Sequence, residues 1–253
     1  IHCTSVADRF GVNVDNVRVE EFGSIYAPKG VTDFVVTADQ TGLQKATMSF
    51  VVPKENYQGE PLSSVSKIEI LRNGKLIKTF ENPVLGATLT YEDEHSDFGF
   101  NTYGIVAYSG ENAGVKVEQT VFCGIYSLPY IVAPTQQEFS LFTIKDNNND
   151  DNTWYYDISD GSLKYAYCSN SADDYVVTPA IELGTAHMIE VVFDAKAGVM
   201  GSEKLEVTYG KSDKPEDQQK AQTFDLTNKE YQTFTATFEV TEHGRYYVGF
   251  HAI

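Results

Sequence analysis

The residues of this sequence best suited to chemistry form an acidic, amide-rich run between positions 146 and 152. Asp146, Asn148, Asp150 and Asn152 occupy alternate positions in a D-x-N-x-D-x-N pattern. In a tight loop this spacing turns successive side-chain oxygens toward one point, and carboxylate and amide oxygens are the ligands that calcium prefers. The run therefore predicts a calcium-binding loop.

The residues around this run indicate what kind of domain would hold the loop. An EF-hand requires glycine at the sixth loop position and glutamate at the twelfth, where this chain has Asp151 and Asp157. The flanking segments 139–143 and 154–156 are rich in strand-forming residues. We expect a calcium loop on an all-β domain. The alternative is a polar turn, because Asn and Asp tolerate left-handed backbone geometry.

No pattern of catalytic residues stands out in the chain. The five histidines are scattered without the H-E-x-x-H spacing of a zinc protease, and neither G-x-S-x-G nor a phosphate-binding loop occurs. The carboxylate clusters at 92–94 and 173–174 are poor glycosidase pairs, because neighbours on a strand point to opposite faces. We interpret the first as a solvated acidic turn and the second as a turn or a metal-binding pair. We expect no enzymatic activity.

A second binding chemistry is open to the aromatic residues around the acidic run. Side chains alternate between the two faces of a strand, so about half of these tyrosines should face the core. The others could form a platform for sugar rings, which makes a carbohydrate-binding surface an alternative. The tyrosines concerned are Tyr155, Tyr156, Tyr165, Tyr167 and Tyr175.

Composition limits the classes of partner. The 253 residues include 36 acidic and 19 basic side chains, for a net charge of −17. Nucleic acid is excluded as a partner, because its phosphates would be repelled. No apolar run approaches the ~20 residues that span a bilayer. The acidic, tyrosine-rich chain suits an extracellular or cell-surface protein, and its start at Ile1, without Met, predicts a mature or excised piece of a longer protein.

The three cysteines give no sign of metal-thiolate or redox chemistry. Cys3, Cys123 and Cys168 lie far apart, and none belongs to a C-x-x-C pair. We expect three buried thiols, with a Cys123–Cys168 disulfide as the alternative.

The first half of the chain predicts a β-sandwich. Between residues 34 and 122, seven short strand-like segments are separated by turn signals. The dipeptide Asn73-Gly74 between two apolar segments predicts a two-residue hairpin turn. The seven segments are 34–37, 46–52, 67–71, 76–80, 88–91, 102–108 and 115–122.

Residues 27–125 resemble a fibronectin type III domain of the kind found in Bacteroidetes surface proteins. The similarity lies in the segments 31–34, 46–53, 67–80 and 103–114. Two positions depart from the family. Phe50 stands where the tryptophan of the second strand is usual, and Asn101 stands where a tyrosine is usual in the sixth. No Arg-Gly-Asp occurs, so integrin binding has no motif behind it.

The second half also reads as strands, after a proline-containing segment at 126–135 that we interpret as a linker. The segments 188–195 and 231–240 alternate regularly, as expected of strands with one solvated face. The polar segment 213–222 predicts a short helix or a mobile loop. The remaining strand-like segments are 140–144, 153–157, 163–167, 175–178, 204–209 and 245–251.

Residues 136–253 are similar to the jelly-roll cleaved-adhesin domains (MAM-like, choice-of-anchor) of Bacteroidetes surface and secreted proteins. The similarity rests on four blocks, at 143–157, 171–183, 203–210 and 244–252. The resemblance implies a calcium ion at the acidic loop, with a ligand from the Asp-Asp pair that follows. Proteins of that family commonly have glycine at the position where this chain has Asp151. The ligands carried over are Asp146, Asn148, Asp150 and Asp174.

Residues 1–26 resemble the last part of a preceding jelly roll, and the domain at 136–253 resembles one lacking its last strand. Within 10–20, apolar residues alternate and then change phase at Asp15, which suggests a bulge. A jelly roll without its final strand exposes a sheet edge. We expect residues 10–20 to associate head-to-tail with that edge on another molecule, with Asp15 as a calcium ligand. The alternatives are a strand packed on its own chain and a frayed tail.

Together these features predict an all-β protein in which a fibronectin type III sandwich is followed by a calcium-stabilised jelly roll. We expect a non-catalytic adhesion or interaction module whose partner is an unidentified host or surface protein or a glycan. The alternatives are a carbohydrate-binding module of an extracellular hydrolase and a passive spacer in a stalk.

Overall fold

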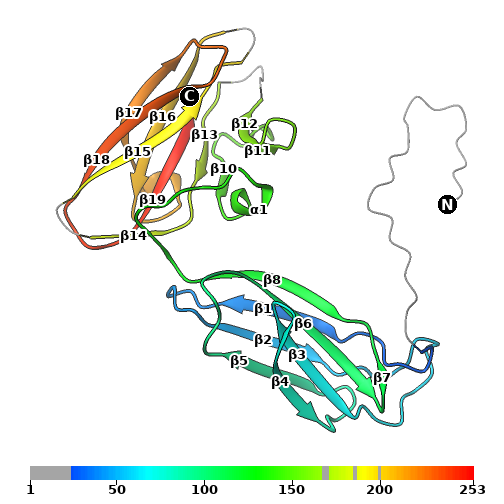
Figure 1. The fold of residues 1–253 in the computed structure, drawn as a ribbon. Coiled ribbons are helices and arrows are strands. Elements are labelled where there is room, and N and C mark those ends of the chain that lie inside the picture. The colour runs from blue at the N-terminus through cyan, green and yellow to red at the C-terminus, as the bar shows by residue number, and fades with distance from the viewer. Residues whose placement is uncertain (1–23, 167–170, 185–186, 199–200) are drawn as a thin grey trace, which may run out of the picture. The chain divides into compact units, whose positions relative to one another are not determined.

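The computed structural model describes residues 24–166, 171–184, 187–198 and 201–253. Nearly all regular structure in these residues is strand, which confirms the predicted all-β class. The chain divides into two compact units, Ile1–Gly124 (unit 1) and Ile125–Ile253 (unit 2). Figure 1 shows the strands of both units.

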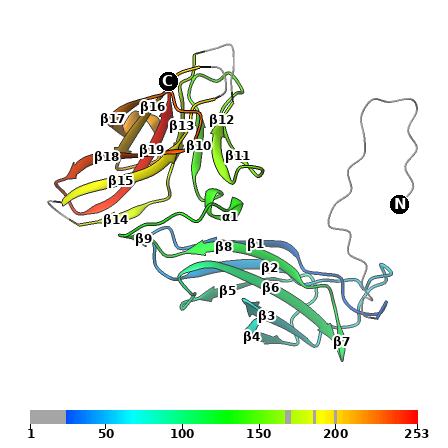
Figure 2. The same ribbon diagram turned by 45° about the horizontal axis from the view of Figure 1, so that its top comes forward.

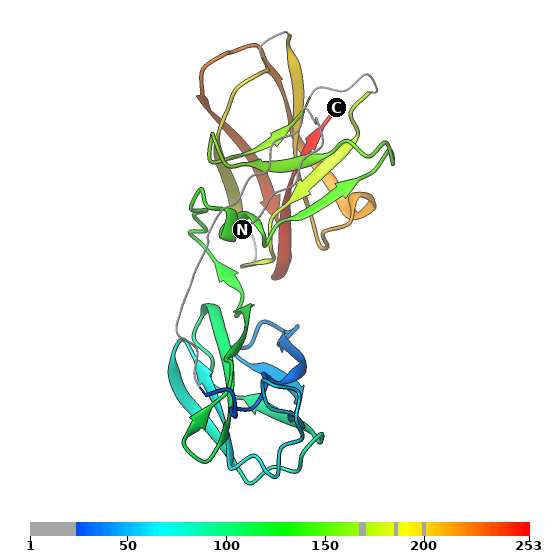
Figure 3. The ribbon, with the colours of Figure 1, turned by 90° about the vertical axis from the view of Figure 1, so that its right-hand side faces the viewer.

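Unit 1 is a sandwich of two sheets (Figures 1 and 3). The smaller sheet has the order β1-β2-β5, and the larger has the order β4-β3-β6, with β7 and β8 both paired to β6. This arrangement agrees with the expected fibronectin-type sandwich. The strands are β1 (Thr32–Ala38), β2 (Ala46–Val51), β3 (Lys67–Arg72), β4 (Lys75–Glu81), β5 (Thr88–Asp93), β6 (Gly99–Ser109), β7 (Asn112–Ala113) and β8 (Val117–Cys123).

The core of unit 1 forms between these sheets because their inward positions are apolar and alternate. Phe50, at the position where the family has tryptophan, is fully buried. Its ring makes edge-to-face contacts with Phe34 and Phe80, at centroid distances of 6.5 and 6.2 Å. Phenylalanine therefore fills the central position of this core.

The hairpin between β3 and β4 turns at Asn73-Gly74, as predicted. Both residues have positive φ, 50° for Asn73 and 79° for Gly74. Two successive left-handed residues match the twist of the strands they join, and Asn and Gly adopt them at the lowest cost.

Unit 2 is a second sandwich, in which a large sheet faces the pair β15–β18, and β11 and β12 form a separate two-stranded sheet. In the large sheet β19 is central, flanked by β13 and β14 on one side and by β16 on the other. Its elements are β9 (Tyr126–Ser127), α1 (Gln136–Phe139), β10 (Thr143–Asp146), β11 (Trp154–Asp157), β12 (Ser162–Tyr165), β13 (Asp174–Val177), β14 (Ile181–Leu183), β15 (His187–Ala195), β16 (Glu203–Gly210), η1 (Pro215–Asp217), β17 (Gln218–Leu226), β18 (Gln232–Val240) and β19 (Gly244–Ala252).

The chain crosses from one layer of this sandwich to the other at four connections. These connections join β14 to β15, β15 to β16, β17 to β18 and β18 to β19. Figure 2 shows β15 and β18 side by side in front of β19. Apolar residues between the layers form the core, including the fully buried Val207, Ala236 and Val240. Tyr209 stacks on Phe238 across the layers, with ring centroids 4.2 Å apart.

Two segments differ from the sequence-based expectation. The prediction of a short helix or a mobile loop at 213–222 holds only for the first part of the segment, where η1 is a 3-10 helix, because β17 follows it. A bulge in its pairing with β16 interrupts the alternation of this polar edge strand. In the segment 126–135, β9 pairs in parallel with β14, and Tyr130 packs against the core of unit 2.

Some predictions fall on residues 1–23 and 167–170, outside the described part of the chain. They concern Cys3, Asp15, Tyr167 and Cys168, as well as the strand at 10–20. No helix within the described residues is long and apolar enough to cross a membrane.

Candidate metal centre

The acidic run forms the connection between β10 and β11 in unit 2. Strand β10 ends at Asp146, which pairs with Asp174 on β13, and β11 begins at Trp154. The pairing places the start of the loop directly beside the Asp173-Asp174 pair. The structure thus places Asp146, Asn148 and Asp150 in one loop that starts beside Asp174, but among the described residues the three aspartates do not converge as one ligand set.

Within the loop, side-chain oxygens fold inward onto backbone N–H groups. The N–H of Asp150 lies 3.2 Å from both Asp146 Oδ1 and Asn148 Oδ1. Asp146 Oδ2 accepts a hydrogen bond from Asp151 N at 2.9 Å, and Asp150 Oδ1 accepts one from Asn152 N at 2.9 Å. Oxygens of the first two alternating residues therefore converge on one point of the loop.

The loop turns tightly because two of its residues have left-handed backbone conformation. Asn149 and Asp151 have φ values of 56° and 62°. Asn and Asp are the side chains that adopt this region most readily apart from Gly. Asp151 therefore takes the conformation that glycine would supply at the same position in the resembling family.

Asp174 braces the loop from β13. Its side chain is fully buried, and its oxygens accept hydrogen bonds from Asn147 N at 3.1 Å and from Tyr165 Oη at 2.8 Å. Its backbone carbonyl accepts a third bond from Trp154 Nε1 at 3.0 Å. Asp174 thus ties the start of the loop to β11 and β12. Its role as a calcium ligand stays a prediction, as does that of Asp15.

A histidine that the sequence did not single out lies next to this brace. His251 on β19 lies between Asp173, whose Oδ1 is 2.8 Å from Nε2, and Glu206, whose Oε2 is 3.3 Å from Nδ1. Its ring stacks on Tyr175 at 3.9 Å. Asp173 also accepts a hydrogen bond from the side chain of Asn147 at 2.8 Å, so the imidazole is linked to the loop.

The pKa of Glu206, on the other side of His251, is lowered by its surroundings. Burial raises its pKa, but hydrogen bonds from Lys220, Thr223 and His251 outweigh that effect, so the pKa lies below its usual value. Glu206 is therefore ionised at neutral pH and holds the imidazole from the side opposite Asp173.

The chemistry of the loop oxygens fits a hard cation such as calcium. Asp146 and Asp150 supply two carboxylates and Asn148 an amide oxygen, and calcium also takes backbone carbonyls and water as ligands. Among the described residues, no three His, Cys, Asp or Glu side chains gather as a ligand set. Calcium here would therefore depend on Asn148 and on backbone carbonyls as well as on the two carboxylates.

The tyrosines near the loop do not share one face. Tyr155 is exposed, whereas Tyr165 packs its ring against Trp154 and Tyr175 stacks on His251. Tyr156 contacts Phe139 and donates a hydrogen bond to a backbone carbonyl. Within the described part of the chain, these residues form no common platform for a sugar.

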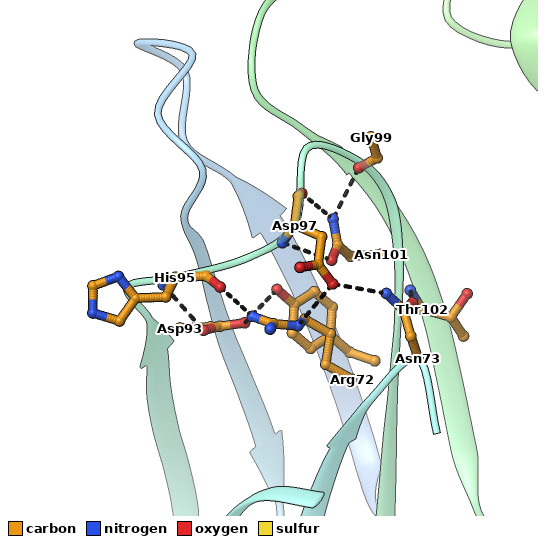
Figure 4. Close-up of polar contacts among 9 residues, drawn as sticks. Arg72, Asn73, Asp93, His95, Asp97, Gly99, Asn101 and Thr102 are labelled. Atoms are coloured by element: carbon orange, nitrogen blue, oxygen red, sulfur yellow. Dashed lines mark hydrogen bonds and ion pairs between the residues drawn. The ribbon is translucent and has the colours of Figure 1, made fainter. Parts of the chain in front are cut away.

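A second polar cluster closes one end of unit 1 (Figure 4). Asp93 is buried, with 5% of its surface exposed, and its Oδ2 accepts hydrogen bonds from Arg72 at 2.7 Å and from Tyr103 Oη at 2.9 Å. The prediction of a solvated acidic turn at 92–94 is therefore wrong for Asp93. No motif predicts that Arg72, 21 positions away, compensates its charge.

The tyrosine of this cluster is strongly affected by its surroundings. Burial and the hydrogen bond to Asp93 raise the pKa of Tyr103 far above its usual value. Tyr103 therefore stays neutral and donates a hydrogen bond to Asp93 throughout the physiological range.

Asn101 holds the connection between β5 and β6 to the sandwich. Its side chain is fully buried, and its amide donates to the carbonyls of Asp97 at 2.7 Å and Gly99 at 2.9 Å. Its carbonyl oxygen accepts a hydrogen bond from Asp97 N at 3.2 Å. In related sandwiches a tyrosine makes an equivalent bond back to the chain. Asn101 thus makes with an amide the contact that a tyrosine makes with its phenol in those sandwiches.

Cys123, at the end of β8, is a free and fully buried thiol. The alternative of a Cys123–Cys168 disulfide is therefore wrong, and Cys123 is the buried thiol that we expected. Burial raises the pKa of the thiol, so it is unreactive at neutral pH.

Comparisons with known proteins leave the chain without an assigned family. No family model and no curated protein matches it. Among solved structures, the FN1–FN3 domains of chicken CNTN1 align with a TM-score of 0.27 at 12% identity, over 90% of this chain and 60% of that chain. A Bacteroides uniformis β-glucuronidase aligns with a TM-score of 0.21 at 7% identity, over 90% and 26%. Similarities this low carry no argument, so the architecture rests on the strand pairing itself.

Proposed function

We propose that this chain is a non-catalytic interaction module of a cell surface or secreted protein, in which calcium stabilises unit 2. Unit 1 would act as a rigid spacer, because its buried polar cluster has its charge compensated by Arg72. Unit 2 would carry the binding surface, with the acidic loop held in place by a bound ion.

The observation that carries this proposal is the shape of the acidic loop. Asp146 and Asn148 direct oxygens to one N–H group, and the loop is already fixed at its start by the buried Asp174. A loop that is preorganised in this way loses little conformational entropy on binding an ion. The ion would supply the positive charge that Arg72 supplies in unit 1.

The proposed ion has a structural role. Among the described residues, neither Asp146 nor Asp174 forms an ion pair with lysine or arginine. Two neighbouring carboxylates repel one another, and a divalent cation would remove this repulsion. Because an ion that binds only the folded state stabilises it by mass action, we expect about 2.7 kcal/mol when calcium stands at ~100 times its Kd.

The proposal is tested by thermal unfolding of the full chain in calcium and in chelator. We expect the transition of unit 2 to move to higher temperature with calcium. In the variant Asp146→Asn, which keeps the hydrogen-bond acceptor but removes the charge, this shift should be lost. Asp225→Asn is the matched control, because that side chain is 74% exposed and on the distant edge strand β17. If calcium shifts neither transition, the loop is only a turn and the chain is better described as a passive spacer.

A further inference from the structure

The two layers of the sandwich in unit 2 differ in size, and the smaller layer, β15–β18, has a long unpaired edge within the described residues. Strand β15 pairs with β18 over nine consecutive residues without interruption, from His187 opposite Val240 to Ala195 opposite Gln232. On its other side β15 has no strand partner within the described part of the chain. Every second backbone N–H and C=O of β15 on that side is therefore available to a further strand.

The side chains of β15 do little to protect this edge. Natural edge strands are usually blocked by lysine, proline or a bulge. The edge strand β17 of the same unit has a bulge and Lys220, and β4 in unit 1 has a bulge in its pairing and two lysines. Strand β15 has none of these features, and its apolar side chains Met188 and Val192 are 67% and 58% exposed.

The inward face of β15 is apolar as well. Ile189 is buried, and Val191 and Phe193 are partly buried against the two core clusters of unit 2. A strand added beside β15 would extend this face and cover the partly exposed sides of Val191 and Phe193. The edge therefore fits a strand with alternating apolar residues.

The sequence pattern predicts such a strand at 10–20. In that predicted strand Val17 and Val19 lie on one face, and Asn16, Arg18 and Glu20 lie on the other. On β15, Glu190 and Asp194 are exposed on the outer face. If the valines face the core, the apolar pattern matches, and Arg18 lies on the same side as these two carboxylates, together with Glu20.

The path of the chain through unit 1 favours a second molecule as the donor. Gly30, before β1, lies against Val117 at the start of β8, where an added Cβ would come 2.7 Å from the valine side chain. Further along β1, Val36 N bonds to Gln119 Oε1 at 3.0 Å. Strands β1 and β8 therefore run in the same direction. The described chain therefore enters β1 at one end of unit 1 and leaves β8 after Cys123 at the other end.

We propose that β15 of one molecule accepts residues 10–20 of a second copy as an added strand. Donor and acceptor are different surfaces, so the contact is head-to-tail and can continue from molecule to molecule. This inference deepens the proposed function, on which it rests, by naming a second copy of the chain as the partner.

The test is a mixing experiment with two variants of the full chain, each followed by sedimentation velocity over a concentration series. Val14→Pro with Val17→Pro removes two N–H groups and blocks the donor. Met188→Lys with Val192→Lys blocks the acceptor at two exposed positions, and unchanged melting verifies that it folds. Wild type should form a concentration-dependent series of oligomers. Each variant alone should stay monomeric, and an equimolar mixture should form a 1:1 dimer and nothing larger.

The control is Val35→Lys, which changes a 53% exposed strand valine in unit 1 and should leave association unchanged. A monomeric wild type, or a mixture that stays monomeric, would overturn the inference. If hydrogen exchange then shows β15 protected in wild type and unprotected in the donor variant, the strand is added within one chain. Each sample is also run with calcium and with chelator. Absence of a calcium-dependent melt contradicts the proposed metal, whereas absence of oligomers contradicts strand addition.

Discussion

The two polar clusters of this protein use similar residues in different ways. In unit 1, the buried Asp93 is met by the guanidinium of Arg72 and the phenol of Tyr103, so its charge is compensated within the fold. In unit 2, the hydrogen bonds to Asp146 within the described residues come from backbone N–H groups, and Asp174 accepts them from a backbone N–H and a phenol. Arg72 thus pairs with Asp93, whereas in the described part of the chain no lysine or arginine pairs with Asp146 or Asp174.

This difference separates a structural cluster from a candidate binding site. A buried carboxylate is costly unless a positive charge lies nearby. Arg72 supplies this charge permanently in unit 1, so that cluster needs no ligand. In the loop of unit 2 the charge would come from outside the chain, which is why its stability should depend on calcium and that of unit 1 should not.

The largest effect is expected when the charge compensation of unit 1 is broken. Asp93→Ala would leave the partly buried Arg72 with only the more exposed Asp97 and the His95 carbonyl among its described partners, and Tyr103 without its acceptor. We expect a loss of about 4 kcal/mol in the free energy of unfolding of unit 1, measured by denaturant titration. The control is Glu94→Ala, whose side chain is 51% exposed and pairs with Lys45 at the surface. That change should cost less than about 1 kcal/mol. Equal losses of stability in the two variants would show that the buried Asp93 contributes no more to the stability of unit 1 than the exposed Glu94 does.

Removing the brace of the loop should have the next largest effect. Asp174→Ala removes the acceptor for Asn147 N and Tyr165 Oη inside unit 2. We expect unit 2 to lose about 3 kcal/mol in chelator, because charged acceptors make the stronger hydrogen bonds. The calcium-dependent shift should shrink as well, since the loop is no longer fixed at its start. An unchanged melt in chelator would contradict the bracing role.

The corner of unit 1 should depend on Asn101 by a smaller amount. Asn101→Ala leaves the carbonyls of Asp97 and Gly99 without their donor. We expect a loss of about 2 kcal/mol in the free energy of unfolding, together with faster hydrogen exchange in the connection 94–98. If Asn101→Tyr unfolds with the same free energy as wild type, a tyrosine can replace the asparagine in holding this connection. No loss in the alanine variant would contradict the account of this position.

The smallest expected effect is a dependence on alkaline pH. Burial raises the pKa of Tyr103, so the folded state favours the neutral phenol. This contribution to stability is fully present below about pH 10, the pKa of an unfolded tyrosine, and is lost as the pH rises above that value. Between about pH 10 and pH 11, the free energy of unfolding of Tyr103→Phe should therefore fall less steeply with pH than that of wild type. Parallel profiles for the two proteins would contradict the assignment.

The sequence allowed local features to be predicted better than long-range ones. The turn at Asn73-Gly74 was predictable because both residues have intrinsic preferences for that geometry. Strand β17 was not, because a bulge interrupts its alternation and its neighbours are polar. An edge strand of this kind is defined by its pairing with β16, which only the folded chain shows.

The same distinction holds for the two polar clusters. The acidic loop was found from the sequence because its oxygens alternate within seven consecutive residues. The contacts of Asp93 with Arg72 and of His251 with Asp173 join residues 21 and 78 positions apart, and no spacing rule identifies such pairs. Polar residues at a distance become a cluster only when sheet register brings them together.

The measurement that tests this comparison most directly is hydrogen–deuterium exchange of the full chain in calcium and in chelator. Peptides that cover residues 146–153 should exchange more slowly with calcium, whereas those that cover residues 92–103 should be unchanged, because Arg72 already compensates the charge there. Asp146→Asn should remove the difference at 146–153. No calcium effect at the loop, or an equal effect in both regions, would contradict the account.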